Sequence, residues 1–194
     1  MSDSSRHFPI ARGPNFSTRA AVFLDRDGTL NAAIMRAGNP YPPASIEEFA
    51  LLPGVTEGCA RLKAAGYVLV VATNQPDVGR GTLAQSAVEA IHARMCQLLP
   101  IDRVEVSYDS GSEDPPSPFR KPAPGMLLRA ARELGLDLTC SWMVGDRWRD
   151  IDCGKSAGCR TVFIDRDGAE RLRARPDFAA HDFGEAVDII LAHR

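Results

Sequence analysis

Short apolar runs alternate with segments of helical spacing along most of the chain, and this alternation limits the possible folds more than any other feature. The short runs are continuously apolar and rich in β-branched residues: 20–24, 67–72, 104–107, 141–144 and 161–164. Continuous hydrophobicity of this length is typical of strands buried on both faces. Segments with helical spacing occupy 55–65, 82–99, 125–134, 150–157 and 183–192. The pattern predicts an α/β fold, with a parallel sheet of about five strands between helices.

Local signals predict where some of these helices begin and end. Gly66, Gly135 and Gly158 each directly follow a helical segment, the position that glycine favours at a helix C-terminus. Thr82 is a candidate N-cap, because its hydroxyl could accept a hydrogen bond from a free amide of the first turn.

Length and composition indicate an ordinary globular protein. At roughly 150 residues per domain, 194 residues predict one domain, which we place at 20–194. Residues 1–19 are rich in serine, arginine and proline and lack an apolar core, so we expect a flexible tail and no secretory signal. No apolar run approaches the roughly 18–20 residues that cross a membrane. We therefore expect a cytoplasmic protein, and a monomer is the default expectation.

Charge and cysteine content exclude further classes. The net charge is −2, from 23 lysines and arginines against 25 aspartates and glutamates, which disfavours a nucleic-acid partner. The five cysteines are odd in number and form no C-x-x-C pair, which disfavours a disulfide framework or a structural zinc site and favours reduced thiols: Cys59, Cys96, Cys140, Cys153 and Cys159.

Polar and charged residues follow three of the predicted strands and open one helix. In chain order they are Asp25, Asp27, Thr73, Asn74, Arg120, Lys121, Asp146 and Asp150. Ligands of open parallel sheets bind beyond the carboxyl ends of the strands, so we expect these side chains to meet in one crevice. Carboxylates with a phosphate oxygen and water suit Mg²⁺, and a carboxylate can act as a nucleophile toward phosphorus. The set is typical of Mg²⁺-assisted phosphoryl transfer.

Four motifs occur in a fixed order along the chain: D-x-D-G-T at 25–29, T-N at 73–74, a lysine at 121 and G-D-x-x-x-D at 145–150. In this order they resemble the haloacid dehalogenase (HAD) superfamily of phosphatases. The resemblance implies a Rossmann-like three-layer sandwich. It also implies that Asp25 is the nucleophile and Asp27 the general acid and base. Mg²⁺ would be held by Asp25, the backbone carbonyl of Asp27, and Asp146.

The same resemblance assigns the phosphate-binding residues. Thr73, Asn74 and Lys121 would hold the phosphate, and Asp150 would support Lys121 or metal-bound water. Asp150 has a second interpretation, as an acid that only stabilises a helix N-terminus.

Motif spacing predicts an enzyme without a cap domain. Asp25 to Thr73 and Thr73 to Lys121 are 48 residues each, and Lys121 to Asp146 is 25. These gaps are filled by core strands, helices and connections, so substrate would be selected by loops.

Longer matches narrow the resemblance. They are F-L-D-R-D-G-T-L-N at 23–31, P-G-V at 53–55, T-N-Q-x-x-x-G-R-G at 73–81 and R-K-P-x-P-G-M at 120–126. Together they are similar to the D-glycero-D-manno-heptose 1,7-bisphosphate 7-phosphatases and the related histidinol-phosphate phosphatases. This implies a small phosphorylated metabolite, a sugar bisphosphate first, with Arg120 engaging its distal group. The alternatives are histidinol phosphate, a polynucleotide 3′-phosphate, and an inactive scaffold on the same fold.

Two segments depart from the family pattern. The family carries a C-x-H…C-x-C zinc loop before R-K-P, but residues 108–119 contain neither cysteine nor histidine, so no zinc is expected. In the predicted loop at 75–81, Asp77 would repel a bisphosphate unless it is paired, with Arg80 as the candidate partner. A second D-x-D-G at Asp165 and Asp167 lacks the following threonine and is interpreted as a surface turn.

Overall fold

The computed structural model describes residues 19–194 except positions 37, 38, 167 and 169, so the predicted tail lies almost wholly outside the described residues. Its centre is a six-stranded sheet in the order β5-β4-β1-β6-β7-β8, with every neighbouring pair parallel. The strands are β1 (Ala21–Leu24), β4 (Val68–Asn74), β5 (Arg103–Ser107), β6 (Trp142–Gly145), β7 (Arg160–Ile164) and β8 (Phe178–Ala180).

The five predicted strands are all present, in keeping with a sheet of about five, and the sheet has one additional strand. The additional strand, β8, is only three residues long, and its sequence Phe-Ala-Ala carries no run of β-branched residues. It joins the sheet by pairing with β7 from Val162↔Phe178 to Ile164↔Ala180. Tertiary pairing makes this segment a strand, without a local signal that the sequence could show.

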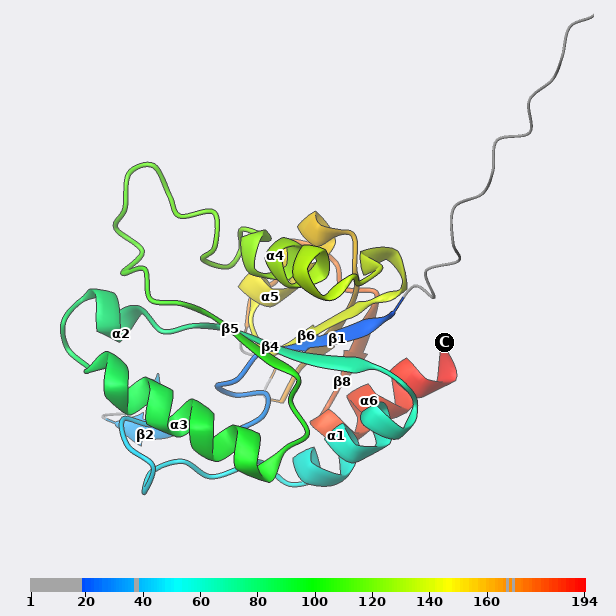
Figure 1. Ribbon diagram of the computed structural model, residues 1–194, viewed down its shortest axis with the longest axis horizontal. Helices are drawn as coiled ribbons and strands as arrows, with labels where there is room; N and C mark the ends of the chain where they lie inside the picture. The colour runs from blue at the N-terminus through cyan, green and yellow to red at the C-terminus, as the bar shows by residue number, and fades with distance from the viewer. Residues whose placement is uncertain (1–18, 37–38, 167, 169) are drawn as a thin grey trace, which may run out of the picture.

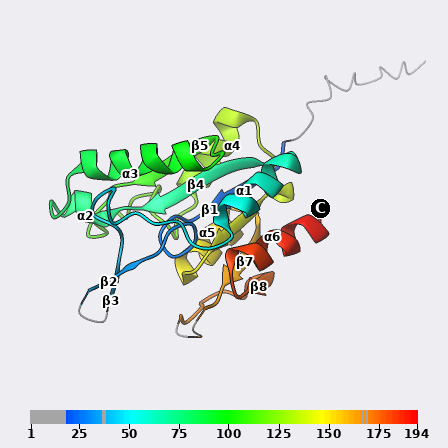
Figure 2. The same ribbon diagram turned by 90° about the horizontal axis from the view of Figure 1, so that it is seen from below.

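Helices cover both faces of the sheet, which confirms the three-layer α/β architecture (Figures 1 and 2). The main helices are α1 (Val55–Ala64), α3 (Gln85–Leu98), α4 (Gly125–Leu134), α5 (Trp148–Ala157) and α6 (Phe183–Ala192). One core layer joins the sheet to α1, α3 and α6, and the other joins it to α4 and α5. Along β1, Val22 and Leu24 belong to the first layer, and Ala21 and Phe23 to the second. This two-sided burial explains the continuous apolar pattern.

The predicted N-cap of α3 is wrong. The helix begins after Ala84, and Thr82 instead donates its hydroxyl to the backbone carbonyl of Asp77 at 3.1 Å. Asp77 lies in a short helix, α2 (Pro76–Gly79), that the sequence analysis did not predict. The hydroxyl therefore closes the turn after α2 and leaves the start of α3 without a side-chain cap.

The connections between the main strands and helices contain further short elements. The chain after β1 forms a two-stranded antiparallel hairpin, β2 (Ile34–Arg36) and β3 (Asn39–Tyr41), before α1 begins. A one-turn 3₁₀ helix, η1 (Leu138–Cys140), precedes β6. No cap domain is inserted anywhere in the described part of the chain, and none of its helices combines the length and apolar composition needed to cross a membrane.

Strand order places β1 at the position where the chain changes direction across the sheet. From β1 the chain moves outward through β4 to β5, then crosses to the other side of β1 and continues through β6, β7 and β8. A crevice at the carboxyl end of β1 is the expected ligand site of such a sheet.

Candidate active site

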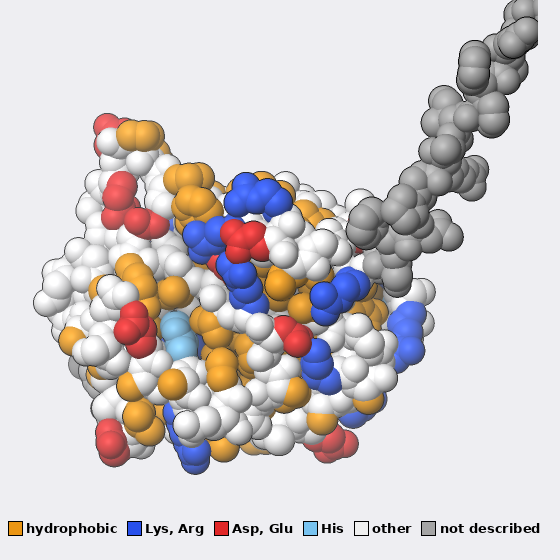
Figure 3. Space-filling model, viewed as in Figure 1, with side chains coloured by type: hydrophobic (Ala, Val, Ile, Leu, Met, Phe, Trp, Pro, Cys, Tyr) orange, Lys and Arg blue, Asp and Glu red, His pale blue; other side chains and the backbone are white. Residues whose placement is uncertain are grey.

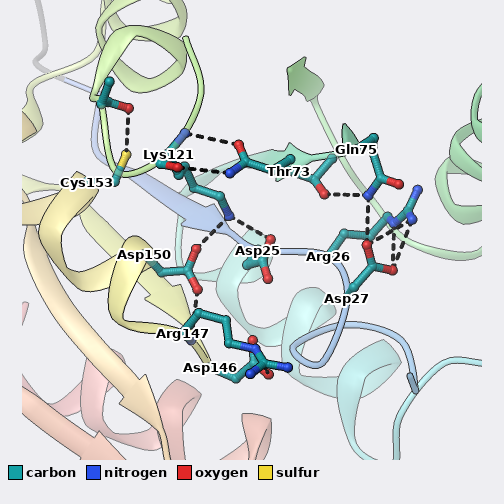
Figure 4. A network of polar contacts seen from close by, with 12 residues as sticks. Asp25, Arg26, Asp27, Thr73, Gln75, Lys121, Asp146, Arg147, Asp150 and Cys153 are labelled. Atoms are coloured by element: carbon teal, nitrogen blue, oxygen red, sulfur yellow. Dashed lines mark hydrogen bonds and ion pairs between the residues drawn. The ribbon is translucent and has the colours of Figure 1, made fainter. Parts of the chain in front are cut away.

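A cavity of about 310 Å³ opens at the carboxyl ends of β1, β4 and β6 and the start of α4. All eight residues that the sequence analysis selected line this cavity. Figure 4 shows most of them, in polar contacts between segments far apart in the chain. The motifs meet because each follows a strand of the same parallel sheet or opens the helix beside it.

Lys121 lies at the centre of the network and links two carboxylates. Its Nζ is 2.7 Å from Asp25 Oδ1 and 2.6 Å from Asp150 Oδ1, and the lysine side chain is 3% exposed. Asp150 also accepts a hydrogen bond from the Arg147 backbone amide at 3.0 Å, at the start of α5. Asp150 thus caps a helix and also contacts Lys121, so it does more than stabilise a helix N-terminus.

Burial and crowding shift the pKa values of these groups. Burial, strengthened by Asp150, Asp146 and Asp27, raises the pKa of Asp25 to about 8 even though Lys121 opposes the rise. Burial and Asp150 raise the pKa of Asp146 to about 6. Burial alone would lower the pKa of Lys121, but the charges of Asp150 and Asp25 outweigh it and raise that pKa. One buried cation thus faces several carboxylates, a balance that favours binding of a further cation.

Three carboxylates are close enough to hold such a cation. One oxygen each from Asp25, Asp146 and Asp150 lies within 4.8 Å of the others. Asp146 Oδ1 is buried and has no hydrogen-bond partner among the described residues. Gly28 lies directly over this carboxylate, at a φ of 86°, and a Cβ there would be 2.2 Å from Asp146 Oδ2. Only glycine allows this approach, and the residues present fit a hard divalent cation.

Asp27 points away from Lys121 into a separate set of donors. Arg26 contacts both of its oxygens, at 2.9 Å and 3.0 Å through Nη2, and is fully buried. Asn31 donates at 3.1 Å and Gln75 at 2.7 Å, and Gln75 also donates to Thr73 Oγ1 at 2.9 Å. Sequence reasoning missed Arg26 and Gln75, although both lie inside the quoted motifs. Their burial was the missing information.

Behind Arg26 lies a buried histidine of α3. Arg26 Nη1 donates to His92 Nε2 at 3.0 Å, which fixes this nitrogen as an acceptor because arginine can only donate. Burial, followed by the charge of Arg26, lowers the pKa of His92 from 6.5 to about 4. His92 is therefore neutral in the folded protein at pH 7.

We expect His92 to make the fold acid-sensitive. A histidine whose pKa is lower in the folded state stabilises the fold above its unfolded pKa and loses that contribution as pH falls. Between pH 7 and pH 5 the wild type should lose about 1–2 kcal/mol more unfolding free energy than His92→Gln. Urea denaturation of both proteins at the two pH values measures this. Equal pH dependence would contradict the assignment.

Asn74 contacts the main chain of Lys121. Its amide donates to the Lys121 carbonyl and accepts from the Lys121 amide, each at 3.0 Å. The pair of bonds fixes the backbone from which the lysine side chain reaches Asp25, so β4 and the start of α4 are held together at the site.

Arginines line the outer part of the cavity. They are Arg80, Arg120, Arg147 and Arg149. Arg147 is paired with Glu170 at 3.1 Å, and Arg80 lies 3.4 Å from Asp77, the partner suggested by the sequence. Within the described part of the chain, neither Arg120 nor Arg149 forms an ion pair with a carboxylate. Burial and the neighbouring Arg149 and Arg80 lower the pKa of Arg120. The sequence analysis selected Arg120 but missed Arg147, the N-cap residue of α5, and Arg149 in the first turn of that helix.

Of the second D-x-D-G motif, the described first aspartate, Asp165, does not line the cavity. Asp165 accepts a hydrogen bond from the Gly168 amide at 2.7 Å and closes a local turn after β7. Asp167 lies outside the described residues.

Sheet order, the aspartates after β1 and β6, and the lysine between them define a HAD-fold phosphatase. A family model described as HAD-hydrolase-like matches residues 118–186. A curated D-glycero-D-manno-heptose-1,7-bisphosphate 7-phosphatase of Thermosynechococcus vestitus is 35% identical, and the match covers 90% of this chain and 97% of that protein. A Mesorhizobium japonicum D-glycero-β-D-manno-heptose-1,7-bisphosphate 7-phosphatase is 36% identical, with 89% and 81% covered. The chain belongs to this family of HAD phosphatases.

A solved structure agrees with this assignment. The D,D-heptose 1,7-bisphosphate phosphatase of B. bronchiseptica, complexed with magnesium and phosphate, aligns with a TM-score of 0.78 at 26% identity. The alignment covers 90% of this chain and 99% of that one.

Proposed function

We propose that the protein removes the 7-phosphate of D-glycero-D-manno-heptose 1,7-bisphosphate. The observation that carries this proposal is the division of one cavity into a carboxylate–lysine centre and an arginine-lined outer part. The centre suits the phosphate that reacts. Arg120 and Arg149, which lack carboxylate partners in the described residues, suit a second phosphate.

In the proposed mechanism, an Asp25 oxygen attacks phosphorus and the bond from phosphorus to the sugar oxygen breaks. Asp27 gives its proton to the departing oxygen. Asp27 then takes a proton from water as the water attacks the phosphorylated Asp25, which releases phosphate and restores the carboxylate. Lys121 neutralises charge on the phosphoryl oxygens, and Asn74 and Asp150 hold the lysine in position.

We propose Mg²⁺ as the cofactor, held by Asp25, Asp146 and the backbone carbonyl of Asp27. The ion would neutralise phosphate charge and lower the pKa of Asp25, keeping the nucleophile ionised. Asp150 is already bonded to Lys121 and the Arg147 amide, so we assign it a supporting role.

Replacing Asp146 by asparagine should weaken Mg²⁺ binding at least about tenfold, because a neutral amide replaces a charged ligand. The measurement is the Mg²⁺ concentration that gives half-maximal thermal stabilisation, with half-maximal activity as a second readout. Asp188→Asn is the matched control, since Asp188 lies on the exposed face of α6 and pairs with Arg61. An unchanged Mg²⁺ requirement in Asp146→Asn would exclude this residue as a ligand.

The arginine-lined cavity favours a bisphosphate over histidinol phosphate, whose distal end carries a positively charged amine. The experiment that tests the proposal compares kcat/KM for heptose 1,7-bisphosphate, histidinol phosphate and a 3′-phosphorylated oligonucleotide. The bisphosphate should be preferred by at least about tenfold, equivalent to one added charged contact. Preference for either other substrate would reject it.

The remaining expectations stay proposals: one domain over 20–194, a monomer, a cytoplasmic location, no nucleic-acid partner and no bound zinc. Elemental analysis of the purified protein tests the last of these.

A further inference from the structure

The segment between β5 and α4 projects from the molecule beside α2 (Figure 1), and acidic side chains lie along it (Figure 3). One of these acids organises the turn at its base. The Glu113 carboxylate accepts hydrogen bonds from the Ser110 amide at 2.6 Å, the Ser110 hydroxyl at 2.8 Å and the Gly111 amide at 2.9 Å. A single side chain thus binds three donors of residues 110–111 and closes the turn.

The closed turn holds two cavity arginines through its backbone carbonyls. Arg120 Nη1 donates to the Asp109 carbonyl at 2.8 Å, and Arg80 Nη2 donates to the Ser110 carbonyl at 3.1 Å. Both guanidinium groups line the cavity, although one follows α2 and the other precedes Lys121. Their shared support is the segment 109–110.

The turn also fits closely against its surroundings. A Cβ at Gly79 would lie 2.2 Å from the Tyr108 carbonyl, and a Cβ at Gly111 would lie 3.0 Å from Arg120 Nε. The backbone of the turn therefore packs directly on α2 and on the Arg120 side chain. A shift of the turn would displace both arginines together.

Apolar packing contributes little to this turn. Gly111, Ser112 and Asp114 are exposed, and none of residues 108–114 belongs to either core cluster. A segment with few apolar contacts depends on its local hydrogen bonds for its shape. In this segment the Glu113 carboxylate accepts three of these bonds, and the others are short-range bonds among Ser107, Asp109, Ser110 and Ser112.

We propose that Glu113 is a positioning residue that holds Arg80 and Arg120 for the distal phosphate of the substrate. This inference rests on the proposed function, because it assigns those arginines to the second phosphate. Glu113 itself does not line the cavity. Its effect should therefore be selective for substrates that carry two phosphates.

The test compares Glu113→Ala with Asp114→Ala, which removes an equal charge from the adjacent residue and no hydrogen bond within the described chain. Glu113→Ala should raise KM for heptose 1,7-bisphosphate about tenfold, the effect of losing one well-placed charged contact. Its kcat/KM for p-nitrophenyl phosphate, which has no distal phosphate, should stay within about twofold. Asp114→Ala should match the wild type on both substrates.

Two further measurements separate positioning from a general structural role. If Glu113 acts through Arg120, the effects of the two substitutions on KM for the bisphosphate should not add. The double variant Glu113→Ala/Arg120→Ala should therefore raise KM by less than the product of the two single-variant effects. Amide hydrogen exchange of the peptide spanning 108–120 should accelerate in Glu113→Ala and remain unchanged in Asp114→Ala. Equal losses on both substrates, additive effects with Arg120→Ala, or unchanged exchange would each overturn the inference.

An error in the proposed function can be distinguished from an error in the role of Glu113. If the wild type does not hydrolyse heptose 1,7-bisphosphate, the proposed function is rejected. Fructose 1,6-bisphosphate and fructose 6-phosphate then serve as competitive inhibitors of p-nitrophenyl phosphate turnover. Glu113→Ala should raise the inhibition constant of the bisphosphate alone, and equal changes for both sugars would overturn the role of Glu113.

Discussion

Asp25→Asn is expected to reduce phosphate release by at least about 10⁴-fold, because the carboxamide is a poor nucleophile and the covalent route is lost. The fold should remain intact. Asparagine has nearly the same size and can still accept a hydrogen bond from Lys121, which lies 2.7 Å from the present carboxylate. Without Mg²⁺ the variant should be at least as stable as the wild type, since burial raises the pKa of Asp25 to about 8 and its ionised form is costly there.

The measurements are steady-state phosphate release and thermal unfolding of both proteins. Asp165→Asn is the control, because Asp165 begins the other D-x-D-G motif and closes only a local turn. It should retain wild-type turnover. Substantial turnover by purified Asp25→Asn would remove Asp25 from the nucleophile role.

Lys121→Met is expected to impair both stability and catalysis. Methionine fills much of the same space but leaves Asp25 and Asp150 buried without their shared cation. Breaking a buried ion pair from one side costs about 3–5 kcal/mol. The loss should shrink as pH falls, because Asp25, whose pKa is raised by burial, can then bind a proton in the folded state and ionic repulsion is relieved.

Turnover of Lys121→Met should fall at least about 10³-fold, since the group that neutralises phosphoryl charge is missing. Saturating Mg²⁺ should restore part of the stability and little of the turnover. Lys63→Met is the matched control, because Lys63 pairs with Asp102 near the surface and should contribute less than about 1 kcal/mol. Wild-type stability at pH 8 in Lys121→Met would contradict the buried ion-pair network.

The sequence was most informative where physical constraints act locally. Strands buried on both faces must be continuously apolar, which is why β1, β4 and β6 could be predicted from their residues alone. β8 and α2 escaped prediction because three- and four-residue elements have no periodicity to read, and their hydrogen bonds depend on neighbours far along the chain. The N-cap prediction for Thr82 failed for the same reason, because its hydroxyl donates to the backbone carbonyl of Asp77, which lies outside α3.

The residues of the candidate site could likewise be predicted only in part from the sequence. Residues directly after strands could be placed at one sheet edge from topology, and all eight line the cavity. Arg149 and Gln75 could not be found, because an arginine in a first helical turn or a glutamine after a strand has no pattern of its own. The direction of each side chain depends on tertiary packing. Glu113 lies in an irregular segment, where no periodicity distinguishes an organising acid from a solvated one.

Because β1 lies at the centre of the sheet, two halves of the chain together form the candidate active site. Residues up to β5 supply Asp25, Thr73 and Asn74, and residues from just before α4 onward supply Lys121, Asp146 and Asp150. Neither half contains both Asp25, the proposed nucleophile, and Lys121, the lysine that contacts it. Hydrolysis therefore requires that the two halves have docked through the pairing of β1 with β6. A folding intermediate with only one half folded should not hydrolyse phosphorylated metabolites.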